Sequence, residues 1–98
     1  MAIFEDRDRL AELCRRWHVN KLSLFGSRLK EQARPDSDLD LLVEFEPGCE
    51  PGLMGISQFE LDLSELVGGL KVDLRTAEDL SRYFRDEVVR TALLQYAA

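Results

Sequence analysis

The spacing of apolar residues along the chain predicts helices that alternate with strands. The first predicted helix has one apolar face and ends at Asn20. This face is formed by Leu10, Leu13, Cys14 and Trp17. Apolar and polar residues alternate in residues 21–25, 38–45 and 70–75, which predicts three strands. Residues 54–67 return to helical spacing, so a second long helix is expected between the second and third strands.

Turn and cap signals divide the C-terminal part of the chain. Gly68-Gly69 should end the long helix. Thr76 has the position of an N-cap, and Asp79 follows in a capping-box position. Helix is predicted from there nearly to the C-terminus, with a break near residues 83–84. The resulting order predicts an α/β (α+β) fold with a small mixed sheet of about three strands, flanked by helices.

Composition limits the classes of function. The chain has 98 residues and a hydrophobic share of 45%, which suits a single domain over residues 1–98. Its net charge of −6 argues against strong nucleic-acid binding, and an anionic substrate such as ATP would need metal ions to approach. No apolar run is long enough to span a membrane, and the N-terminus does not resemble a signal peptide. A cytoplasmic protein without a membrane partner is therefore expected.

The cysteines and the histidine are predicted to have no role as ligands. Cys14 and Cys49 show no metal-ligand spacing, so both are expected to be free thiols in a reducing compartment. Cys14 should lie in the core, because it is on the apolar face of the first helix. Cys49 lies in a loop rich in proline and glycine and should be exposed. His18 is interpreted as a helix-end residue, where a cation is favourable.

Aspartates interrupt two of the predicted strands. Side chains at i and i+2 point to the same face of a strand, so Asp38 and Asp40 should project together. The opposite, buried face should be formed by Leu39, Leu41 and Val43. Asp73 interrupts the third strand in the same way, and Arg75 is expected on the opposite face, outside the site. Three carboxylates on neighbouring strands predict a site for Mg²⁺ or Mn²⁺, as used in nucleotidyl transfer.

A Gly-Ser turn lies between the first two predicted strands and should open a short polar helix. Gly26 lets the backbone approach a phosphate closely, and the helix N-terminus offers free N–H groups. The Ser27 hydroxyl can donate one more hydrogen bond. Arg28, Lys30 and Arg34 follow and add positive charge. The turn is therefore predicted to bind the nucleotide, through Gly26, Ser27, Arg28 and Arg34.

Together these motifs resemble a known signature. Gly26-Ser27, ten further residues and then Asp-x-Asp at 38–40 is the pattern of the DNA polymerase β-like nucleotidyltransferase superfamily, whose third carboxylate corresponds to Asp73. The short chain is similar to the minimal nucleotidyltransferases, the MntA-type antitoxins encoded beside a HEPN-domain toxin. The resemblance implies the polymerase β-like fold and transfer of AMP from ATP to a tyrosine of a HEPN toxin. It implies that the Asp-x-Asp pair bridges two Mg²⁺ ions and that Asp73 completes the ion nearest the attacking hydroxyl.

Two other functions stay open at the level of sequence. One is a catalytically weak antitoxin that only covers its toxin, and the other is an enzyme acting on a small molecule such as an aminoglycoside. No segment is left over to build an acceptor pocket, so the acceptor is expected on a macromolecule. Contact surfaces are expected at Leu53-Met54 and in the C-terminal tail, at Tyr83, Phe84 and Tyr96. A homo-oligomer also stays open.

Overall fold

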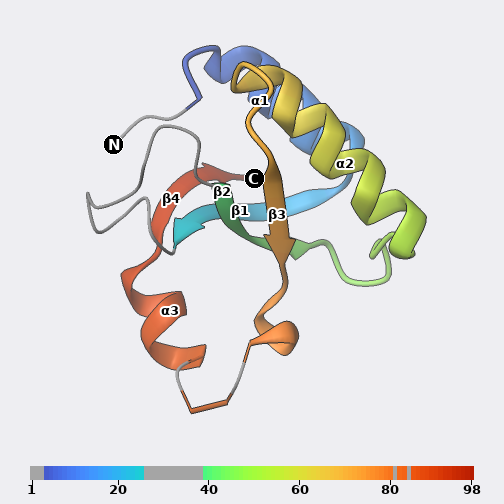
Figure 1. Cartoon of the computed structure of the whole chain (residues 1–98). Helices are drawn as coiled ribbons and strands as arrows, with labels where there is room; N and C mark the ends of the chain where they lie inside the picture. The colour runs from blue at the N-terminus through green and yellow to red at the C-terminus, as the bar shows by residue number, and fades with distance from the viewer. Residues whose placement is uncertain (1–3, 26–38, 81, 84) are drawn as a thin grey trace.

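A four-stranded mixed sheet organises the described part of the chain. The computed structural model describes residues 4–25, 39–80, 82–83 and 85–98 (Figure 1). The strands are β1 (Val19–Phe25), β2 (Leu39–Phe45), β3 (Val72–Arg75) and β4 (Leu93–Ala97). Their order in the sheet is β3-β2-β1-β4. β2 and β3 are parallel, whereas β1 is antiparallel to both of its neighbours. The expected fold class is confirmed, with one strand more than predicted.

The additional strand is β4, which corrects the prediction of a helix running nearly to the C-terminus. Helix α3 (Arg85–Thr91) ends earlier, and β4 follows and pairs with β1. Local sequence favours helix here, because Ala, Leu and Gln are good helix formers. Pairing with β1 overrides this preference and buries Gln95, which is 2% exposed.

Two long helices cover one face of the sheet. Helices α1 (Arg7–Arg16) and α2 (Leu53–Leu66) lie side by side on this face, while α3 lies on the other side of the molecule (Figure 1). The apolar side chains of β2 point toward the two helices and are buried, at Leu39, Leu41, Val43 and Phe45. The alternating strand pattern is thereby confirmed, and the face of β2 that carries Asp40 points away from α1 and α2. No helix among the described residues is long and apolar enough to cross a bilayer.

Helix α1 ends at a different residue from the one expected. The Asp6 side chain caps its N-terminus by accepting a hydrogen bond of 3.0 Å from the Arg9 backbone N–H. At the other end His18 adopts a left-handed backbone conformation, with φ of 58°, and turns the chain into β1. Asn20, the expected terminator, already lies in β1. His18 therefore holds the position that glycine most often occupies after a helix.

The remaining turns follow the sequence signals. Gly68 and Gly69 have positive φ angles of 70° and 87° and end α2, as expected. Asp79 accepts hydrogen bonds from the backbone and the hydroxyl of Thr76, at 3.1 and 3.0 Å. These bonds lower the pKa of Asp79. The capping box is confirmed, but it starts only a three-residue 3₁₀ helix, η2 (Ala77–Asp79).

The two cysteines should differ sharply in reactivity. Cys14 is 0% exposed, and burial raises the pKa of its thiol to about 12, whereas Cys49 is partly exposed. We therefore expect Ellman's reagent to modify one thiol rapidly in the native protein and both thiols in denaturant, because only the thiolate reacts. The variant Cys49→Ser should lose the rapid phase. Fast modification of both thiols in the native protein would contradict the buried position of Cys14.

Candidate active site

Asp40 and Asp73 lie next to each other on neighbouring strands. They are register partners in the parallel pair β2–β3, so their Cα atoms are about 4.8 Å apart. The flanking residues Leu39 and Leu74 are buried on the helix side, so both carboxylates share the opposite face. Phe25, the last residue of β1, is the register partner of Asp40 on its other side. Three adjacent strands therefore meet at this position.

Five predicted site residues lie outside the described residues. They are Gly26, Ser27, Arg28, Arg34 and Asp38. The described strands nevertheless fix both ends of the segment that contains them. Gly26 follows Phe25 in the chain, and Asp38 precedes Leu39. Phe25, the residue before the Gly-Ser motif in the sequence, is the register partner of Asp40.

Arg75 lies on the same face as Asp73, which corrects the expectation that it points away. Its Nη2 atom is 3.2 Å from Oδ2 of Asp73. The two residues are at i and i+2 in β3, and this spacing places side chains on one face of a strand. Half of the Arg75 side chain is exposed, so the ion pair is screened by water. The guanidinium still offsets part of the repulsion between the two aspartates.

Glu60, a residue of α2 that no sequence motif indicates, holds β3 in place. The backbone N–H of Leu74 donates a hydrogen bond of 2.8 Å to Oε2 of Glu60. Among the described strands β3 is at the edge of the sheet, so an N–H that points outward has no partner in any of them. Glu60 supplies that partner and fixes the position of the residue next to Asp73. Its only sequence signal is a carboxylate on a helix, which does not distinguish it from a solvated side chain.

A cavity lies on the aspartate face of the sheet. Its volume is about 370 Å³, within the range of ligand sites. Its floor includes Leu42, two residues from Asp40 and the register partner of Arg75. The residues around it include Lys21, Glu44, Thr76, Glu78 and Val89. The sequence predicts no segment that would build such a pocket. The cavity arises because η2 and α3 return across the sheet after β3.

The donor atoms at the strand pair suit a hard divalent cation. Asp40 and Asp73 offer carboxylate oxygens on one face, and their side chains are only partly exposed. Magnesium and manganese prefer oxygen ligands of this kind. Two aligned carboxylates repel each other in the absence of a cation, so a bound ion would relieve an unfavourable interaction. The two described members of the three predicted carboxylates therefore fit the metal that the sequence predicts.

The sequence of the chain matches a known family of domains. A family model described as the nucleotidyltransferase domain matches residues 7–95 of the chain. The match includes all of the strands and helices named above except the last two residues of β4. It also includes every residue of the predicted site.

Two relatives align with most of the chain. The relative from Thermococcus cleftensis, protein adenylyltransferase MntA, is 37% identical over 79 residues, which are 81% of this chain and 77% of the relative. A relative from Methanocaldococcus jannaschii is 27% identical over 93 residues, which are 95% of this chain and 97% of the relative.

Solved structures share the fold. One described as a minimal nucleotidyltransferase is 37% identical, with a TM-score of 0.70 over 89% of this chain and 86% of the other. A toxin–antitoxin structure with AMP-PNP is 18% identical, with a TM-score of 0.71 over 95% of this chain and 74% of the other. At this lower identity the likeness concerns the fold alone.

Proposed function

The chain belongs to the nucleotidyltransferase domain family, and from this membership we propose that it transfers AMP from ATP to a tyrosine hydroxyl of a HEPN-domain toxin, so acting as its antitoxin. The observation that carries the proposal is the alignment of Asp40 with Asp73 on one face of neighbouring strands. This alignment supports a metal-dependent transfer centre, and the name of the relative from Thermococcus cleftensis supports AMP as the group and a protein as the acceptor.

Different residues of this chain would have different roles in the proposed reaction. Asp38, Asp40 and Asp73 would hold Mg²⁺ or Mn²⁺, which supplies charge stabilisation at the transferred phosphoryl group when it is bound. The backbone N–H groups of Gly26 and Ser27 would bind the triphosphate and orient it. Arg28 and Arg34 would add positive charge there. Asp73 would accept the proton of the attacking hydroxyl, and the α-phosphate would form its new bond to that oxygen as pyrophosphate leaves.

The cavity beside the aspartates is suited to the acceptor rather than to the triphosphate. Among the described residues that line it, three carboxylates, those of Glu44, Glu50 and Glu78, face the single cation of Lys21. Such a rim repels phosphate groups that carry no metal. Apolar side chains, including Leu42 and Val89, form other parts of the wall and suit an aromatic ring. We assign the cavity to the acceptor tyrosine and the residues beside it.

Exposed apolar side chains in two segments are the contacts that we propose for the partner. Leu53 and Met54, in the first turn of α2, are 88% and 89% exposed, as the sequence analysis expected of a contact surface. Tyr83 is 87% exposed. Tyr96 instead packs against the core, so it is a poor contact residue, and Phe84 lies outside the described residues. Large exposed apolar side chains are typical of protein-binding surfaces.

Intact mass spectrometry tests the proposed reaction directly. The chain is mixed with a purified HEPN-domain toxin, ATP and Mg²⁺, and the toxin is weighed. Each transfer should add the mass of one AMP, and none should be added when Asp40 and Asp73 are both replaced by asparagine. If the wild-type chain protects cells from the toxin without adding mass, and the double variant protects equally, the chain acts by covering the toxin.

Arg75 should affect the Mg²⁺ concentration that the proposed reaction requires. Its guanidinium contacts Asp73, so a divalent cation must compete with it for the same carboxylate. The variant Arg75→Gln should lower the Mg²⁺ concentration for half-maximal pyrophosphate release by about two- to fivefold, the effect of an exposed ion pair worth up to 1 kcal/mol. Arg15→Gln, on the far side of the sheet, should have no effect. A higher Mg²⁺ requirement in Arg75→Gln would show instead that Arg75 helps to bind the nucleotide.

A further inference from the structure

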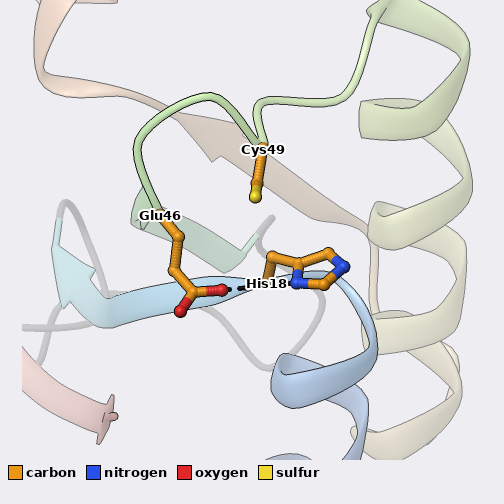
Figure 2. A group of neighbouring side chains, drawn as sticks. All are labelled: His18, Glu46 and Cys49. Atoms are coloured by element: carbon orange, nitrogen blue, oxygen red, sulfur yellow. Dashed lines mark hydrogen bonds and ion pairs between the residues drawn. The ribbon is translucent and has the colours of Figure 1, made fainter.

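Three potential metal ligands meet at the opposite end of β2 from the candidate active site. Figure 2 shows His18, Glu46 and Cys49 with their polar atoms directed toward a common point. The ligand atoms of the three residues all lie within 4.8 Å of one another. Nδ1 of His18 and Oε2 of Glu46 are 3.3 Å apart. We call these three residues the His18–Glu46–Cys49 cluster.

The backbone fixes the relative positions of the three residues. The carbonyl of His18 accepts a hydrogen bond of 2.8 Å from the N–H of Glu46. The N–H of Cys49 donates one of 2.9 Å to the carbonyl of Glu46, which closes a tight turn around Gly48, whose φ is 79°. The left-handed conformation of His18 sets the direction in which its ring leaves the chain. Each ligand therefore reaches the cluster from a backbone position that is already fixed.

We propose that the His18–Glu46–Cys49 cluster binds a zinc-type transition metal. Imidazole nitrogen, carboxylate oxygen and thiolate sulfur are the three kinds of zinc ligand found in proteins, and the thiolate disfavours magnesium. Two ligands of a tetrahedral zinc ion are about 3.3–3.7 Å apart, given the usual bond lengths. The separation of Nδ1 and Oε2 already meets this value. The sulfur needs a shift of at most about 1.5 Å, which rotation about its side-chain bond supplies.

The cluster is exposed to solvent, so a metal ion can reach it. A water molecule can then occupy the fourth coordination position of the ion. The side chains of His18 and Glu46 are 60% and 50% exposed, and Cys49 is partly exposed. When zinc binds, the Cys49 thiol loses its proton to solvent and the sulfur forms a bond to the metal. Nδ1 of His18 gives its lone pair to the metal in place of its present contact with Glu46. Three protein ligands and one water complete a tetrahedron.

This zinc site is separate from the proposed magnesium site. Glu46 follows Asp40 by six residues, which is about 20 Å along an extended strand. The bound ion would join the end of α1, through His18, to the loop between β2 and α2, through Cys49. In the apo protein the side chains at this junction form one exposed ion pair, which adds little to the backbone hydrogen bond between Glu46 and His18. The site is therefore a metal clamp between two segments of the fold, independent of nucleotide transfer.

Cobalt(II) provides a direct spectroscopic test. The full chain is stripped of metal with a chelator and titrated with Co²⁺, which gives a near-ultraviolet charge-transfer band when a thiolate binds it. The wild-type chain should show this band, saturating at one equivalent. Cys49→Ser should lack the band, and His18→Asn should weaken Co²⁺ binding at least about tenfold. Asparagine tolerates the left-handed backbone of His18, so that variant keeps the turn.

Thermal unfolding and a matched control complete the test. Zn²⁺ at 100 times its dissociation constant should raise the melting temperature of the wild-type chain by about 10 °C, by mass action. Cys49→Ser should melt at the wild-type temperature without metal and show no such rise. Glu50→Gln, which changes the carboxylate next to Cys49, should behave as wild type in both measurements. The proposal is overturned by a wild-type chain without the band, by a band that persists in Cys49→Ser, or by equal Co²⁺ affinity in His18→Asn.

Discussion

Replacing Asp40 with asparagine should reduce nucleotidyl transfer by about 1,000-fold or more, because the proposed metal centre would lose a charged ligand beside the phosphate group that is transferred. Asp40 lies between Phe25, which leads into the Gly-Ser motif, and Asp73. It is therefore the described carboxylate with the most central position. The rate is measured as pyrophosphate release with ATP and Mg²⁺, in the presence of the partner protein.

The fold of the Asp40→Asn variant should survive. The substitution keeps the size of the side chain and removes one of two like charges on adjacent strands. We expect the melting temperature without metal to stay within about 5 °C of wild type, as for a partly exposed position. The added nucleotide and Mg²⁺ should raise the melting temperature of the wild-type chain but not of the variant.

Asp8→Asn is the matched control for this experiment. It removes the same charge from the exposed first turn of α1, on the helix-covered side of the sheet. This variant should retain wild-type transfer. Full activity in Asp40→Asn would place the metal elsewhere, whereas equal losses in both variants would point to a general effect of charge. Asp73→Asn should resemble Asp40→Asn, with a smaller loss if Asp73 acts mainly on the attacking hydroxyl.

The spacing of apolar and polar residues predicted most of the strands and helices. It also predicted the strand face on which Asp40 and Asp73 lie. Alternation in β2 and β3 placed Asp40 and Asp73 on a polar face, and the structure aligns them in register. The rule that side chains at i and i+2 share a face also applies to Arg75, so its position beside Asp73 was available from the sequence. The sequence could not show that the two strands pair with this register, because that depends on the crossover through α2.

The features that the sequence did not predict depend on contacts between segments that are distant along the chain. The segment that forms β4 has good helix formers, and only its pairing with β1, about 70 residues earlier, makes it a strand. His18 and Cys49 are likewise distant in sequence. The antiparallel pairing of Val19 with Phe45 brings them together, and no spacing of cysteines or histidines signals it. Glu60 acts on β3 through one tertiary hydrogen bond.

Replacing Phe59 with alanine should have the largest effect on the fold. Phe59 is 0% exposed and lies in α2, where its ring stacks on Trp17 at a centroid distance of 5.5 Å. It also contacts the ring of Phe45, at 6.2 Å. One side chain thus connects α2 with the end of α1 and with the central strand β2. Removing a buried phenylalanine costs about 3–5 kcal/mol, a large part of the stability of a small domain.

We expect the melting temperature of Phe59→Ala to fall by about 15–30 °C, as measured by circular dichroism, because a domain of this size loses several degrees for each kcal/mol. Leu61→Ala, on the same helix but 63% exposed, should change it by no more than about 4 °C. Phe59→Leu should fall between the two, since it keeps most of the apolar volume.

The packing of Phe59 also bears on the site, because α2 carries Glu60, whose carboxylate holds the backbone of β3 beside Asp73. Phe59→Ala should therefore lose activity as it unfolds, with both transitions at the same temperature. A variant that melts like wild type would show that α2 is not anchored to the sheet through this ring.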